Sequence, residues 1–106
     1  DSLPVMTLNP NLEQMLHNIL QQNGGNQGLV IEPQLAEGLF KSLAQNCQEI
    51  ENQGQPAVLV VSPGIRPWLA KLIRNRLSDL TVLSYSEIPD DQSIKVVATI
   101  DVETPQ

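Results

Sequence analysis

The stretch Ala57-Val58-Leu59-Val60-Val61, followed by Ser62-Pro63-Gly64, decides how this chain folds. Continuously apolar, β-branched residues are typical of a strand that is buried on both faces of a sheet. Ser62 and Pro63 are typical of a helix start, because a serine side chain can cap a free amide and proline has no amide to leave unpaired. The pattern therefore predicts a central strand that leads directly into a helix.

Beyond this turn the sequence predicts one helix and two further strands. The apolar stripe of the helix is Ile65, Trp68 or Leu69, Leu72, Ile73 and Leu77. Thr81 to Glu87 is the next predicted strand, so that Ala57 to Tyr85 forms a strand–helix–strand unit. Ile94 to Ile100 is predicted to be the last strand. The six residues 88–93 suit a tight reversal, so we expect this strand to run antiparallel to its predecessor.

The N-terminal half predicts a strand and two helices. Leu3 to Leu8 has β character, and Asn9-Pro10 then reads as the cap and first residue of a helix that ends near Gln22. Residues 29–31 read as an extended segment. A second helix is predicted from Pro33 to about Gly54. Its inward residues are Leu35, Leu39, Leu43, Cys47 and Ile50, with Ala36 and Phe40 beside them.

These elements predict one small α/β domain over residues 1–106, with three helices and a mixed, mostly parallel sheet of about four strands. The expected order is βα-α-βαββ, and residues 101–106 are expected to be a frayed tail. With one Phe, one Trp and one Tyr among 106 residues, the core must be aliphatic.

Composition also narrows the class of function. The net charge of −6 argues against nucleic acid as a partner, since phosphate binding needs a basic surface. The single cysteine suggests a reducing compartment, and no apolar run is long enough to span a membrane. Because the sequence starts without Met at Asp1-Ser2-Leu3-Pro4, we expect it to be an excised piece of a longer protein.

The Ser62-Gly64 loop is the first candidate for chemistry, because ligands of open α/β sheets bind at the carboxyl ends of strands and helix N-termini attract anions. The glycine pattern of a nucleophile elbow is absent, and so are the glycines and Lys-Ser or Lys-Thr of a phosphate loop. Helix capping is the favoured interpretation. A small anionic-ligand-binding domain that uses this loop remains the alternative function.

Other reactive residues give no catalytic or metal site. His17 lies off the apolar stripe of its helix and is interpreted as a solvated surface residue, and Cys47 as inert packing. Glu87, Asp90 and Asp91 lack the ligand spacing of a calcium loop and are interpreted as an acidic turn. We therefore expect no enzyme activity, no metal and no cofactor.

The cations are concentrated on the predicted third helix, which carries Arg66, Lys71, Arg74 and Arg76. Arg66 and Arg74 are eight residues apart, so we expect them two turns apart on one face of the helix, with Lys71 close by. One interpretation is a solubilising outer face. The other is a docking surface for an acidic partner, because complementary charge orients and accelerates association. The sequence pattern leaves both open.

The residues from 58 to 100, VLVVSPGIRPWLAKLIRNRLSDLTVLSYSEIPDDQSIKVVATI, resemble the C-terminal end of the FlhA family of flagellar and virulence type III export-gate proteins. The most specific pieces are Ser62-Pro63 with Arg66, and Leu83-Ser84-Tyr85 with Glu87-Ile88-Pro89. LPVMTLNPNLEQML at the start and IEPQLAEGL at the second helix also match. The resemblance covers nearly the whole chain, and SYSEIPDD favours the flagellar branch.

This resemblance implies a non-catalytic role in protein export. The chain is similar to the fourth and last subdomain of the cytoplasmic part of an integral inner-membrane protein. In that family nine cytoplasmic parts form a ring, whose partners are neighbouring gate subunits, the stalk protein of the export ATPase and chaperone–substrate complexes. The fragment alone is expected to be a monomer on the cytoplasmic side.

We expect the protein-binding surface to lie on the third helix and the turn after the following strand. The residues of this expected surface are Arg66, Lys71, Arg74, Ser84, Tyr85, Glu87, Ile88 and Pro89.

Overall fold

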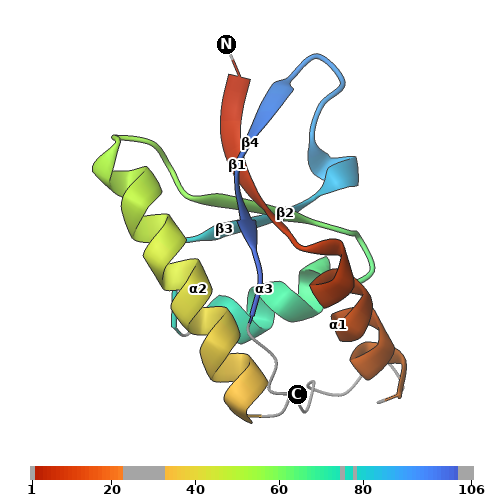
Figure 1. Cartoon of the computed structure of the whole chain (residues 1–106). Helices are drawn as coiled ribbons and strands as arrows, with labels where there is room; N and C mark the ends of the chain where they lie inside the picture. Colours follow the sequence, from red (N-terminus) through yellow and green to blue (C-terminus); the bar gives the residue numbers. More distant parts are fainter. Residues whose placement is uncertain (1, 23–32, 75, 78, 103–106) are drawn as a thin grey trace.

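The computed structural model of the protein describes residues 2–22, 33–74, 76–77 and 79–102 (Figure 1). Its elements are β1 (Ser2–Leu8), α1 (Pro10–Gln22), α2 (Pro33–Asn52), β2 (Val58–Val61), α3 (Arg66–Arg74), β3 (Thr81–Ser84), a short 3-10 helix η1 (Tyr85–Glu87) and β4 (Ser93–Ile100). The strands form one four-stranded sheet in the order β3-β2-β1-β4. The predicted α/β class, with three helices and four strands, is confirmed.

The three helices lie together on one side of the sheet, below it in Figure 1, and the main core fills the space between. Leu12, Leu16, Leu43 and Leu69 are among its buried residues. A second, smaller cluster on the other face contains Val5, Val58 and Val60, against which Leu3, Leu83, Ile88 and Ile94 pack. Every residue of β2 is buried, as its unbroken apolar sequence predicts.

The expected antiparallel last strand is wrong. β4 does not pair with β3; it pairs in parallel with β1 at the opposite end of the sheet, from Ser2 with Ser93 to Leu8 with Ile100. All strand pairs of the sheet are parallel. β1 has seven residues with which β4 can pair, whereas β3 has only four. The connection from β3 to β4 also packs Ile88 against the smaller cluster.

Boundaries also differ from the prediction at β3 and at the C-terminal tail. The strand expected over residues 81–87 ends at Ser84, because Tyr85 begins the turn of η1. The tail expected to fray from residue 101 is fixed at its start: Asn9 Nδ2 donates to Asp101 Oδ2 over 3.2 Å, and Val102 packs against the main core. Residues 103–106 lie outside the described residues.

The start of α1 and the end of α2 follow their sequence signals, but α3 does not. α3 begins at Arg66 and not directly after Ser62, so the predicted helix cap at Ser62 is wrong, and it ends at Arg74, so that Arg76 and Leu77 lie beyond it.

The Asn9 side chain accepts a hydrogen bond of 2.9 Å from the Asn11 amide, which confirms the predicted cap of α1. α2 ends at Asn52, and Gly54 follows with a positive φ of 80°, a conformation that glycine adopts at low cost. The extended segment predicted at residues 29–31 lies outside the described residues. Within the described chain, no helix has the length and apolarity needed to cross a membrane.

Candidate protein-binding site

The predicted binding residues gather mainly where β2 and β3 end. Arg66, the first residue of α3, donates from Nε to the Val82 carbonyl oxygen at 3.3 Å and forms an ion pair of 2.9 Å with Glu87 Oε1. About two-fifths of each of these two charged side chains is exposed. The pair therefore ties the start of α3 to the turn after β3.

Glu87 organises that turn through the backbone. Its Oε1 accepts a hydrogen bond of 3.0 Å from the Ser84 amide, and Ser84 Oγ lies 2.9 Å from Ser86 Oγ. The hydrogen bond from the Ser84 backbone amide, together with the nearby Arg66 charge, lowers the pKa of the Glu87 carboxyl below its ordinary value. The buried Ser84 and the charged Glu87 thus shape the turn rather than stand free for a ligand.

The tip of the same turn is the part that faces outward. Tyr85 is 46% exposed, which makes it one of the exposed large hydrophobic side chains of the described chain, and Pro89 is exposed too. Ile88 is half-buried against the smaller cluster. Burial, followed by the charge of Glu13, raises the pKa of the Tyr85 hydroxyl. Tyr85 and Pro89 can therefore contact a partner, while Ile88 anchors the turn.

Lys71 and Arg74 are exposed farther along α3, away from this network. A helix turns by about 100° per residue, so the two side chains lie about 60° apart and roughly 80–140° from Arg66. The three predicted cations thus do not share one face. Arg66 holds the turn, and Lys71 and Arg74 form a separate basic face on the outside of α3.

Sequence reasoning missed two residues of α1 that complete this edge. His17 Nε2 lies 2.8 Å from Ser62 Oγ, and Glu13 Oε2 accepts a hydrogen bond of 2.9 Å from the Ser62 amide. His17 is half-buried, so its interpretation as a solvated residue is wrong. The available signal was that Glu13 and His17 are four residues apart on a helix that begins where β1 ends, beside the end of its parallel neighbour β2.

This contact disfavours the anionic-ligand alternative at the Ser62-Gly64 loop. The Glu13 carboxylate already takes the Ser62 amide that an anion would use, and its charge repels a second anion. Gly64 is needed for close packing here, since a Cβ atom at this position would lie 2.7 Å from His17 Cε1. Ser62 and His17 are therefore best explained as the contact that seats α1 on the β2–α3 loop.

The remaining reactive residues show no assembled site. Cys47 is buried in the main core, and burial, followed by the charge of Glu51, raises the pKa of its thiol. Within the described ranges, no group of three His, Cys, Asp or Glu side chains could hold a metal ion.

Comparisons with known proteins place this fold among export proteins. The FHIPEP family matches residues 1–93. The flagellar biosynthesis protein FlhA of Escherichia coli K12 is 36% identical over 100 residues, which cover 94% of this chain and 14% of that protein. The chain thus spans about one-seventh of the length of this curated relative.

Two of the solved structures that share the fold are compared with this chain. The Chlamydia pneumoniae CdsV protein, in complex with CdsO, matches with a TM-score of 0.74 and 26% identity over 94% of this chain and 29% of that chain. The nonameric EscV cytosolic domain from the type III secretion system matches with a TM-score of 0.66 and 24% identity, over 93% and 29%. From the family match over most of its length, this chain belongs to the FHIPEP family, which includes the FlhA export proteins.

Proposed function

We propose that this chain is a non-catalytic protein-interaction module of a bacterial type III export apparatus, positioned at the cytoplasmic face of the inner membrane. The observation that carries the proposal is the fold match to CdsV, which was solved with a bound protein, CdsO. The flagellar relatives and the nonameric EscV domain support a place within a ring of gate subunits. In that setting the module helps to dock a CdsO-type stalk protein and chaperone–substrate complexes.

The surface proposed for docking has two parts. The first is the basic face of α3, formed by Lys71 and Arg74, which are exposed. The second is the tip of the turn after β3, where Tyr85 and Pro89 are exposed. Arg66, Ser84, Glu87 and Ile88 hold that tip in place. Because the rest of the chain is acidic overall, this local excess of positive charge favours an acidic surface on the partner.

The test is binding of this chain to the CdsO-type protein of the same organism, measured by calorimetry at two salt concentrations. Each of Lys71→Glu and Arg74→Glu is expected to weaken binding by about threefold to tenfold, with a smaller difference at high salt. Both side chains are exposed, so the melting temperature should stay close to that of the parent chain.

Lys95→Glu is the matched control, because it makes the same charge reversal on β4, on an exposed residue of another element. Equal weakening by Lys95→Glu would mean that only net charge matters. A parent chain that does not bind the CdsO-type protein at all would contradict the proposal itself.

A further inference from the structure

We draw no further inference here: the strongest candidate, the outer edge of the sheet at β4, where Val96 and Val97 are exposed, carries nothing, because nothing in the structure shows what covers it.

Discussion

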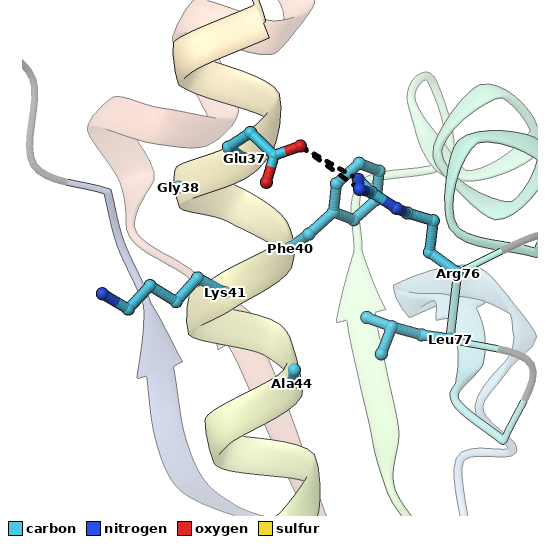
Figure 2. A pocket seen from close by; sticks show the side chains of 7 residues that line it. All are labelled: Glu37, Gly38, Phe40, Lys41, Ala44, Arg76 and Leu77. Carbon is cyan, nitrogen blue, oxygen red and sulfur yellow. Dashed lines mark hydrogen bonds and ion pairs between the residues drawn. The ribbon is translucent and has the colours of Figure 1, made fainter.

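Polar side chains gather in two regions of the molecule, at the edge of the sheet where β2 and β3 end and in a depression beside α2. At the sheet edge, the charged and polar side chains form ion pairs and hydrogen bonds with other parts of the chain. These side chains are Arg66, Glu87, Glu13 and His17. Beside α2, one depression is lined by Glu37, Phe40, Lys41 and Ala44 of that helix and by Arg76 and Leu77, and the Arg76–Glu37 ion pair crosses it (Figure 2).

The comparison teaches that a cluster of polar residues is not in itself a binding site. The charged residues of the sheet edge bond to other parts of the chain, whereas the residues proposed for a partner, Lys71, Arg74, Tyr85 and Pro89, are exposed. In the depression beside α2, the charged Arg76 and Glu37 pair with each other, and Arg76 lies over the ring of Phe40.

The largest effect is expected for Val60→Asp, which removes both regions at once. Val60 is fully buried in the central strand, so an unpaired carboxylate there should cost at least about 3–4 kcal/mol and unfold the domain. Circular dichroism should show no cooperative melt. Val96→Asp is the control, because Val96 is 52% exposed on the edge strand β4. A parent-like melt for Val60→Asp would contradict the assignment of the core.

A smaller effect is expected for Gly64→Ala, which tests the sheet edge alone. The new Cβ atom would lie 2.7 Å from His17 Cε1 and should displace the imidazole from Ser62, at a cost of about 1 kcal/mol in the free energy of unfolding. In a His17→Ala background the same substitution should cost much less, because the clash is gone. Chemical denaturation of the four proteins measures this coupling, and purely additive costs would show that His17 does not constrain the loop.

The smallest effect is expected for Glu87→Gln and depends on pH. The pKa of the Glu87 carboxyl is lower in the folded chain than in the unfolded chain. The ionised carboxylate therefore stabilises the fold fully at a pH above the pKa of the unfolded chain, and this stabilisation is lost as the pH falls through the pKa of the folded chain. Between pH 6 and pH 3 the melting temperature of the parent should therefore fall by a few degrees more than that of Glu87→Gln. Asp90→Asn is the control, at an exposed position in the same connection. Its melting temperature should fall as much as that of the parent. An identical fall for parent and Glu87→Gln would remove this carboxylate from the acid response.

The sequence by itself determined the parts of the structure that depend on local patterns. The apolar run of β2, the asparagine–proline start of α1 and the helical stripe of α2 each specify their element, because propensity, capping and periodicity act over a few residues. The expected binding surface stays a prediction. Arg66 and Glu87 do lie together, but as an internal ion pair.

Only the tertiary structure decided which distant segments meet. No local pattern predicts that β4 pairs with the free edge of β1 and not with β3, which precedes it in the sequence. The pairing depends on how many residues of each strand can form hydrogen bonds with β4. The contact of His17 with Ser62 across 45 positions follows from β1 and β2 being parallel neighbours. The depression beside α2 likewise exists because Arg76 and Leu77 fold back beside that helix. Local preferences depend on neighbouring residues, whereas contacts between distant segments depend on the free energy of the whole packed chain.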